Sequence, residues 1–194
     1  MTVKRVSVFC ASSSRVNPEY FTLAKAIGKE LAVNKIELVY GAGAIGLMGC
    51  IADMCLEHKG QVTGIIPYFM KELEWAHNNL TQLLLVDDMH ERKKQLIMNT
   101  DAIVALPGGV GTLDELLEAI TLKQLGQITI PIIIVNPDGF YDPLLNMFEN
   151  LIANNFMRPQ HRDIWTVITT PEELVPSLKD APEWDGSIVK IAQM

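Results

Sequence analysis

The chain has 194 residues, of which 48% are hydrophobic and 20% charged, a composition typical of one folded domain with a substantial core. The formal net charge of −7 argues against a nucleic-acid partner, because a nucleic-acid-binding face normally appears as an excess of Lys and Arg. No apolar run approaches the roughly 18 residues of a membrane-spanning helix, and no signal-peptide pattern precedes the first strand, so we expect a cytoplasmic protein with no membrane partner.

Short apolar runs alternate along the chain with longer helical patterns. The predicted strands are continuously apolar and rich in β-branched residues, and they lie at 6–12, 36–41, 61–67, 81–86, 101–107 and 130–136. The predicted helices lie at 18–33, 45–59, 88–99, 112–125 and 140–154. Asn17 and Pro18 mark the start of the first helix as its N-cap and its first residue, and Gly126 marks the end of the fourth.

Continuously apolar strands are typical of a parallel sheet that helices cover on both faces. The alternation therefore predicts an α/β fold with a doubly wound, Rossmann-like, mostly parallel sheet and ligands at the carboxyl ends of its strands. From residue 155 onward, a short strand in WTVIT and a short helix in PEELVPSL predict an irregular C-terminal extension. We expect a single domain over residues 1–180 and a C-terminal tail over residues 181–194.

The three cysteines form no CxxC pair. Cys10 lies in the first predicted strand, and Cys50 and Cys55 lie five residues apart on the second predicted helix. Their positions predict buried, reduced thiols rather than a disulfide or a metal site.

The first glycine-rich loop, GAGAIG at 41–46, matches the pattern GxGxxG between a strand and a helix. It follows the second strand rather than the first, and the next strand ends in GIIPYF without an acidic residue for a ribose, which disfavours nicotinamide binding. Two interpretations stay open. Gly46 and Gly49 would allow close packing in a tight turn, or Ser13, Gly43 and Gly46 would contribute to the backbone wall of a nucleotide site.

The second glycine-rich loop, PGGVGT at 107–112, joins the fifth strand to a helix. Gly108, Gly109 and Gly111 can take positive φ and leave backbone N–H groups accessible. If Thr112 opens the helix, an anion there meets free N–H groups, the positive end of the helix dipole and a hydroxyl. The Walker A pattern is absent, so a monophosphate is a better guest than a triphosphate with Mg²⁺.

Three charged residues near this loop allow both a structural and a functional interpretation. Glu115 can close a capping box with Thr112. Arg92 and Lys93, in MHERKK at 89–94, can belong to an exposed helix start, or a guanidinium there can grip a phosphate. His90 is better suited to the surface than to a role as a base, and no His, Cys or Asp set has metal-ligand spacing.

Taken together, MHERK and PGGVGTLDE resemble the paired motifs of the LOG (Lonely Guy) family of cytokinin riboside 5′-monophosphate phosphoribohydrolases, whose members are often labelled “possible lysine decarboxylase”. CASSS, YGAGAIGLMG, GIIP and ITLKQLG extend the resemblance over nearly the whole chain. One departure is Ala42, where the family usually has a third glycine.

The resemblance implies hydrolysis of the N-glycosidic bond of a nucleoside 5′-monophosphate, which releases the base and ribose 5-phosphate. It implies a homodimer with the site near the subunit interface, and Arg92 and Glu115 as the catalytic pair. The residues that it assigns to substrate binding are Glu74, Lys93, Gly108, Gly109, Val110, Gly111, Thr112 and Thr121.

The chemistry of such a reaction suits these residue types. Breaking a ribosyl C–N bond develops positive charge on the sugar, which a carboxylate stabilises while it orients the attacking water. No cofactor or metal is needed. Two alternatives remain, a non-catalytic nucleotide carrier on the same fold and a pyridoxal-phosphate decarboxylase, although nothing in the sequence singles out a Schiff-base lysine.

Overall fold

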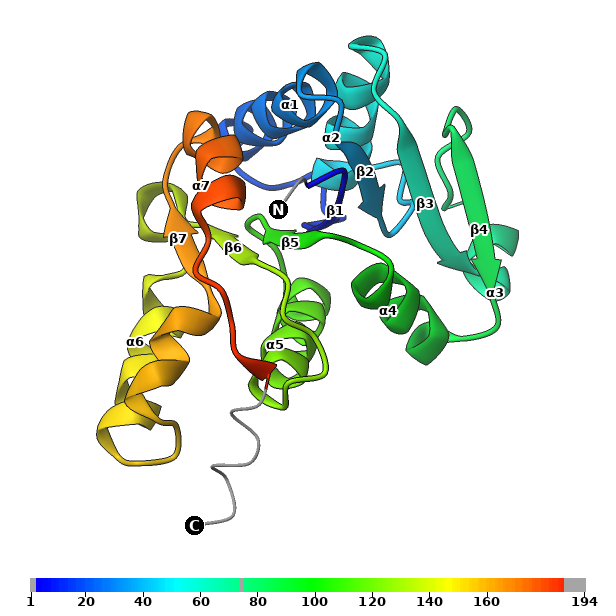
Figure 1. Cartoon of the computed structure of the whole chain (residues 1–194). Coiled ribbons are helices and arrows are strands. Elements are labelled where there is room, and N and C mark those ends of the chain that lie inside the picture. The colour runs from blue at the N-terminus through cyan, green and yellow to red at the C-terminus, as the bar shows by residue number, and fades with distance from the viewer. Residues whose placement is uncertain (1–2, 74, 187–194) are drawn as a thin grey trace.

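A computed structural model describes residues 3–73 and 75–186 of the chain. Its seven strands form one parallel sheet in the order β4-β3-β2-β1-β5-β6-β7 (Figure 1). The strands are β1 Arg5–Phe9, β2 Glu37–Tyr40, β3 Val62–Pro67, β4 Gln82–Val86, β5 Ala102–Ala105, β6 Ile132–Val135 and β7 Thr166–Ile168. The predicted parallel sheet is confirmed, and each of the six predicted main strands is present.

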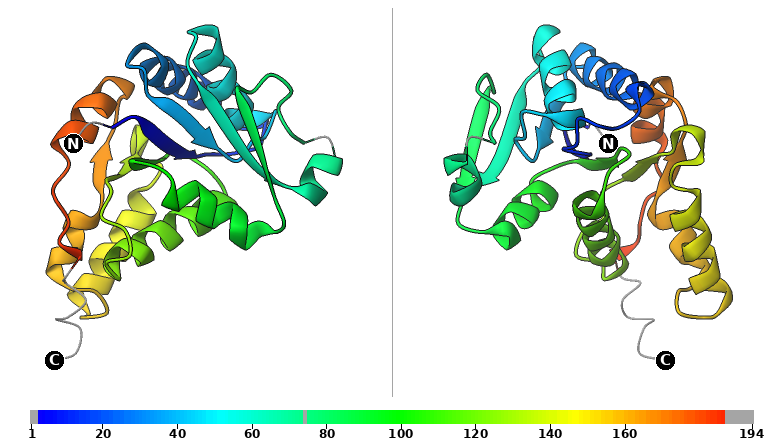
Figure 2. Two further views of the ribbon diagram at one scale, coloured as in Figure 1. Left: turned by 45° about the vertical axis from the view of Figure 1, so that its right-hand side comes forward. Right: turned by 180° about the vertical axis from the view of Figure 1, so that it is seen from behind.

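Helices cover both faces of the sheet, as the apolar strands predicted (Figure 2). They are α1 Pro18–Val33, α2 Gly46–Glu57, α3 Tyr68–Glu72, α4 Met89–Met98, α5 Val110–Gln124, α6 Asp142–Ala153 and α7 Leu174–Asp180. Three 3₁₀ turns lie at Pro137–Gly139, Pro159–Ile164 and Pro171–Glu173. One hydrophobic core packs α1, α2 and α7 against the sheet, and a second core packs α4, α5 and α6 against its other face.

The chain reverses its direction across the sheet between β1 and β5. Strands β1 to β4 are added on one side, and β5 then returns to pair with the other side of β1, with Val6 opposite both Leu38 and Ala102. Ligands of doubly wound sheets bind at such a switch point, outside the carboxyl ends of the strands. The loops that follow β1 and β5 meet there, and the N–H of Ala11 donates to the carbonyl of Pro107 at 3.2 Å.

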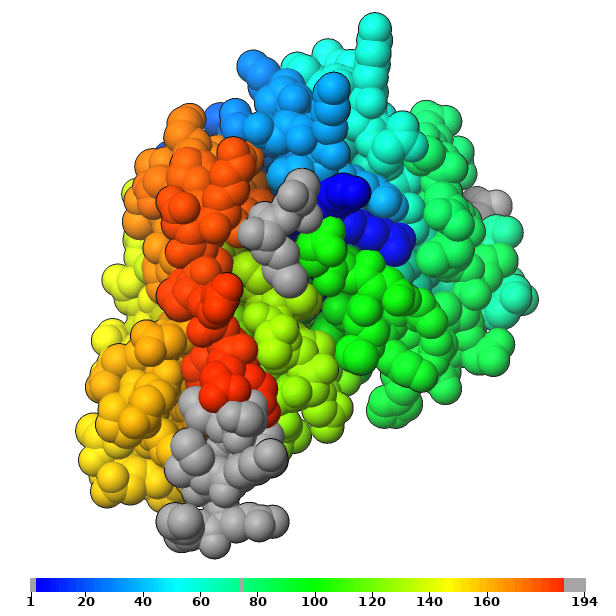
Figure 3. All heavy atoms as spheres, viewed as in Figure 1, coloured from blue at the N-terminus to red at the C-terminus, as the bar shows by residue number. Residues whose placement is uncertain are grey.

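The segment after residue 155 contains the predicted short strand and short helix, but it is not an irregular extension. Strand β7 pairs in parallel with β6, with Ile133 opposite Thr166, and α7 contributes Leu174 and Leu178 to the first core. Figure 3 shows the following red segment lying along the surface beside α5. There the buried indole of Trp184 donates to the carbonyl of Lys123 at 2.7 Å.

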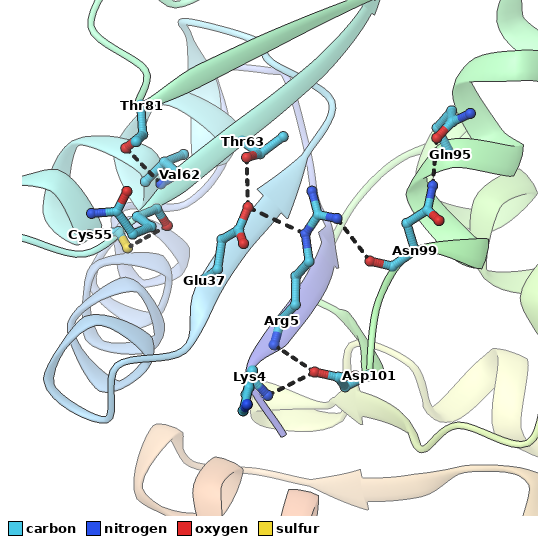
Figure 4. A network of polar contacts seen from close by, with 11 residues as sticks. Lys4, Arg5, Glu37, Cys55, Val62, Thr63, Thr81, Gln95, Asn99 and Asp101 are labelled. Atoms are coloured by element: carbon cyan, nitrogen blue, oxygen red, sulfur yellow. Dashed lines mark hydrogen bonds and ion pairs between the residues drawn. The ribbon is translucent and has the colours of Figure 1, made fainter. Parts of the chain in front are cut away.

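A network of polar contacts braces the amino-terminal edge of the sheet (Figure 4). The guanidinium of Arg5 lies 3.3 Å from the carboxylate of Glu37, which also accepts a 2.6 Å hydrogen bond from Thr63. The carboxylate of Asp101 accepts from the backbone N–H groups of Lys4 and Arg5 at 2.8 and 2.9 Å. These contacts join β1, β2, β3 and the start of β5 at the edge opposite the switch point.

The predicted burial is confirmed for two of the three cysteines. Cys10 and Cys55 are buried, Cys50 is half-buried, and all three are free thiols. Burial raises the pKa of Cys55 to about 11, so this thiol is unreactive at neutral pH. In the described part of the chain, no helix combines the length and the apolar character needed to traverse a bilayer.

Candidate active site

Helix α4 brings Arg92 into the protein rather than to an exposed helix start. The helix begins after Asp88, whose carboxylate accepts from the N–H groups of His90 and Glu91, both at 2.8 Å. Arg92 follows one turn later and is only 6% exposed, whereas His90 is exposed. The interpretation of Arg92 as part of a solvated helix start is therefore wrong.

The guanidinium of Arg92 lies at the carboxyl ends of β2 and β3. Its Nε donates to the carbonyl of Ile65 at 3.2 Å, and Nη2 donates to the carbonyl of Gly41 at 3.4 Å. Its Nη1 donates to Oε1 of Glu115 at 2.9 Å. Three different elements thus hold one planar cation in a single orientation.

Glu115 is free to meet Arg92 because it does not cap its own helix. Helix α5 begins at Val110 after Gly109, which provides no side-chain cap, and the first bond across this start runs from Leu113 N–H to the Gly109 carbonyl at 3.0 Å. Thr112 is consequently the third residue of the helix and not its N-cap, so the predicted capping box is wrong. One turn further, Glu115 faces α4.

Glu115 is only 8% exposed, and two opposing effects act on the pKa of its carboxyl group. Burial raises the pKa of its carboxyl group, and this effect exceeds the lowering by the neighbouring guanidinium of Arg92, so the pKa lies above its ordinary value. Such a shift marks a group whose environment suits proton-transfer chemistry.

The glycines of the loop between β5 and α5 provide space rather than unusual backbone angles. Among the described glycines, positive φ occurs at Gly46, Gly126 and Gly139 but at none of the three glycines of this loop, so that part of the prediction is wrong. A Cβ atom added at Gly109 or Gly111 would have no heavy atom within 4 Å. The chain thus leaves room beside the first turn of α5, whose N–H groups lack partners within the helix, and such a turn suits an anion.

The first glycine loop, residues 41–46, is a tight turn. Gly46 has φ +67°, and a Cβ there would lie 2.4 Å from the backbone of Ser12, while a Cβ on Gly49 would lie 2.1 Å from the carbonyl oxygen of Ala44. The close-packing interpretation is confirmed. Buried Ala42 has φ +63°, a left-handed conformation that favours glycine and explains the family's usual residue there.

Three other predicted site residues make contacts elsewhere and not with the Arg92–Glu115 pair. Lys93 reaches across to α5, where its Nζ lies 3.1 Å from Asp114 and 2.7 Å from Glu118, and these acids raise its pKa. Thr121 is exposed and donates within its own helix, about 9 Å along the axis from Glu115. Glu74 lies outside the described residues. Ser13 is exposed, and its hydroxyl accepts from the N–H of Arg15.

Sequence reasoning missed three contributors to this site. The carbonyls of Gly41 and Ile65 hold Arg92, and the hydroxyl of Tyr141 donates to the carbonyl of Leu106 just before the glycine loop. Every residue has a backbone carbonyl, so the sequence does not show which carbonyls will bind a side chain. Tyr141 is 35 residues from its partner, too far for a local pattern to connect them. The acids that pair with Lys93 could have been found, because Asp114 and Glu118 have the i, i+4 spacing of one helix face.

These features define a class of protein. The chain is a doubly wound α/β protein whose switch point combines an open glycine loop at a helix N-terminus with a buried arginine–glutamate pair. The family model described as “Possible lysine decarboxylase” matches residues 48–178, and the chain belongs to this family, the LOG family. The membership predicted from the paired motifs is confirmed.

Two relatives illustrate the similarity. The cytokinin riboside 5′-monophosphate phosphoribohydrolase LOG5 of Arabidopsis thaliana is 40% identical over 188 residues, which cover 96% of this chain and 82% of the relative. LOG7 of the same plant, which carries the same activity in its name, is 40% identical over 190 residues, covering 97% of this chain and 87% of the relative.

Solved structures share the fold at lower identity. The molybdenum cofactor binding protein from the phototrophic bacterium Rippkaea orientalis has a TM-score of 0.71 and 20% identity, and the match covers 92% of this chain and 97% of that chain. The molybdenum cofactor carrier protein of Chlamydomonas reinhardtii also has a TM-score of 0.71, at 16% identity, with 93% and 98% covered. At such identities the likeness concerns the fold alone.

Proposed function

We propose that this protein hydrolyses the N-glycosidic bond of a nucleoside 5′-monophosphate and releases the free base and ribose 5-phosphate. The observation that carries the proposal is the buried Arg92–Glu115 pair beside the open glycine loop of α5. Relatives with 40% identity over nearly the whole chain support it, since their names specify phosphoribohydrolases of cytokinin riboside 5′-monophosphates.

The glycine loop binds the 5′-phosphate in this proposal. The free N–H groups at the start of α5 and the helix dipole favour a dianion, and the space in front of Gly109 and Gly111 admits it without a clash. A phosphate bound there fixes the ribose over the following turn of the helix, where Glu115 lies.

Glu115 acts on the ribose. As the C–N bond breaks, positive charge develops at C1′ and the ring oxygen, and the carboxylate stabilises this charge. The same carboxylate orients the water that attacks C1′. The water oxygen becomes the C1′ hydroxyl of ribose 5-phosphate, and one proton is delivered to the nitrogen of the leaving base, so no cofactor or metal enters the balance.

Arg92 positions Glu115 and contacts the substrate. Its three contacts with Ile65, Gly41 and Glu115 use three of the five guanidinium N–H groups. The remaining N–H groups bind phosphate or sugar oxygens and steady the departing base. Arg92 contributes hydrogen-bond donors and a positive charge rather than a transferable proton.

The test measures base release from purified protein with AMP, prenylated AMP and the matching nucleosides, followed by chromatography of the free base. We expect monophosphates to be cleaved in preference to nucleosides. Equal rates on both would contradict the role of the glycine loop. A carrier on the same fold would bind the nucleotides and release no base from any of them.

We further propose that the enzyme is a cytoplasmic homodimer. Met98 on α4, Leu117 on α5 and Leu125 at the C-cap of α5 are exposed apolar side chains, which a second copy would bury. The three free thiols suit a reducing compartment. Light scattering of the eluted protein tests the dimer, and Leu117→Lys should shift the mass toward that of one chain.

A further inference from the structure

The residue before the glycine loop, Leu106, accepts a side-chain hydrogen bond beyond the end of the β5–β6 pairing. Strand β5 pairs with β6 as far as Ala105 opposite Ile134, and β6 then ends at Val135. Leu106 directly follows β5 and is fully buried. Without a side-chain donor, its carbonyl oxygen would therefore have neither a partner in β6 nor a water molecule. A buried carbonyl without a donor is costly.

The hydroxyl of Tyr141 supplies that donor. It lies 2.6 Å from the carbonyl oxygen of Leu106, and the side chain is only 2% exposed. Burial raises the pKa of Tyr141 well above its ordinary value, so the hydroxyl keeps its proton and remains a donor. On the opposite side, the N–H of Leu106 donates to Phe9 at 2.9 Å.

Tyr141 is itself fixed in place. Its backbone N–H donates to Oδ1 of Asn136 at 2.6 Å, and Nδ2 of Asn136 donates to Asp142 at 2.8 Å. Its ring also meets the ring of Phe140 edge-on, with centroids 4.9 Å apart. The hydroxyl therefore cannot follow the Leu106 carbonyl if the loop moves.

The orientation of the Leu106 carbonyl determines where the glycine loop begins, because the loop follows directly in the chain. Pro107 follows with a fixed φ, and Gly108 packs against Thr112, since a Cβ on Gly108 would lie 2.1 Å from the Thr112 hydroxyl. A rotation of the peptide between Leu106 and Pro107 would therefore displace Gly108 and Gly109, which precede the open N–H groups of α5.

We propose that Tyr141 is a positioning residue of the phosphate site, whose hydroxyl holds the Leu106 carbonyl so that the N–H groups at the start of α5 converge on the phosphate of the substrate. The identity of the ligand rests on the proposed function. The geometric role of Tyr141 rests on the contacts of its hydroxyl, backbone and ring.

The experiment compares Tyr141→Phe with the wild-type protein and with Tyr40→Phe. Tyr40 is a matched control, because its hydroxyl is also fully buried but has no hydrogen-bond partner among the described residues. Calorimetry measures the Kd of ribose 5-phosphate, and kinetics measures kcat and KM for AMP and the inhibition constant of adenine.

In Tyr141→Phe we expect the Kd of ribose 5-phosphate and the KM for AMP to rise by about 5- to 20-fold. The inhibition constant of adenine should stay unchanged, because in the proposed arrangement this loop binds the phosphate and not the base. Tyr40→Phe should retain wild-type values. If Tyr141→Phe only lowers the thermal midpoint and leaves both constants unchanged, the residue is structural and the inference is overturned.

A second variant covers the case in which Tyr141→Phe does not fold. Asn136→Ala removes the acceptor of the Tyr141 N–H and leaves the hydroxyl present, and it should raise the Kd of ribose 5-phosphate in the same direction. A wild-type protein that binds ribose 5-phosphate but releases no base would overturn the proposed reaction, while the calorimetric comparison would still decide the role of Tyr141.

Discussion

The substitution Glu115→Gln separates catalysis from stability at this site. Glutamine keeps the shape of the side chain, and its amide oxygen can still accept the 2.9 Å hydrogen bond from Arg92. It carries no negative charge, so it neither stabilises the cationic sugar nor orients water as a base does. We expect kcat to fall by about 10²- to 10⁴-fold.

The expected effect on stability follows from two opposing energies. Unit charges 2.9 Å apart attract by about 6 kcal/mol at an effective dielectric constant of 20, and a buried carboxylate loses hydration worth several kcal/mol. The raised pKa of Glu115 indicates that the loss of hydration exceeds the attraction. Because glutamine removes both contributions, we expect the free energy of unfolding at pH 7 to change by less than about 2 kcal/mol.

The small expected change in the free energy of unfolding agrees with the linkage between protonation and folding. A carboxyl group whose pKa is raised on folding contributes stability while it is protonated, and this contribution is lost as pH rises through the folded pKa. Glutamine resembles the protonated form and does not titrate, so the variant should lose the pH dependence of stability that Glu115 causes between its unfolded and its folded pKa.

The assays are base release from AMP and unfolding in urea. Glu37→Gln is the control, because it also removes the acid of an arginine–glutamate pair, but at the opposite edge of the sheet (Figure 4). A Glu115→Gln protein with the wild-type kcat would refute the catalytic role. A loss of stability above about 3 kcal/mol would show that the attraction of Arg92 outweighs the burial of the carboxylate.

Three further predictions concern the protonation of Glu115, the ion pairs of Lys93 and the backbone of Ala42. The raised pKa of Glu115 predicts that kcat falls as pH decreases through a value above the ordinary 4.5, because the carboxylate becomes protonated; an acid limb at or below 4.5 in the pH–rate profile would contradict this. Lys93→Met removes ion pairs between α4 and α5 and should lower the free energy of unfolding in urea by about 1 kcal/mol. The KM for AMP should then change less than about threefold, and a rise above about tenfold would assign Lys93 to the phosphate instead. Ala42→Val forces a β-branched residue into φ +63° and should destabilise the protein by at least about 2 kcal/mol; an unchanged urea midpoint would count against strain at this position.

Local patterns were sufficient for most of the fold. Helix α1 runs from Pro18 to Val33 as predicted, since Asn17 accepts from the N–H of Glu19 and starts the helix. The five-residue helix α3, Tyr68–Glu72, escaped prediction because one turn is too short for a hydrophobic period. The start of α5 was placed two residues late, because glycines in its first turn have low helix propensity and obscure the boundary.

The sequence predicted the residues of the candidate site but not the contacts that they make. The paired motifs MHERK and PGGVGTLDE marked Arg92, Glu115 and the loop between β5 and α5. They did not reveal that Arg92 is buried, since cations near a helix start are usually solvated. The carbonyls that hold Arg92 come from Ile65 in β3 and from Gly41 just after β2. For Lys93, the i, i+4 spacing of Asp114 and Glu118 was visible in the sequence, but that this face of α5 meets α4 was not.

The sequence by itself determined the parallel sheet, its helices and the glycine-rich turn between β5 and α5, because hydrophobic period, capping residues and glycine placement act over a few residues. Only the tertiary structure decided that Glu115 meets Arg92 instead of capping its own helix, and that Tyr141 supports the loop from 35 residues away. These choices depend on the strand order, which brings the ends of β2, β3 and β5 to one edge. Side chains buried there must find partners among whatever groups the fold places within reach.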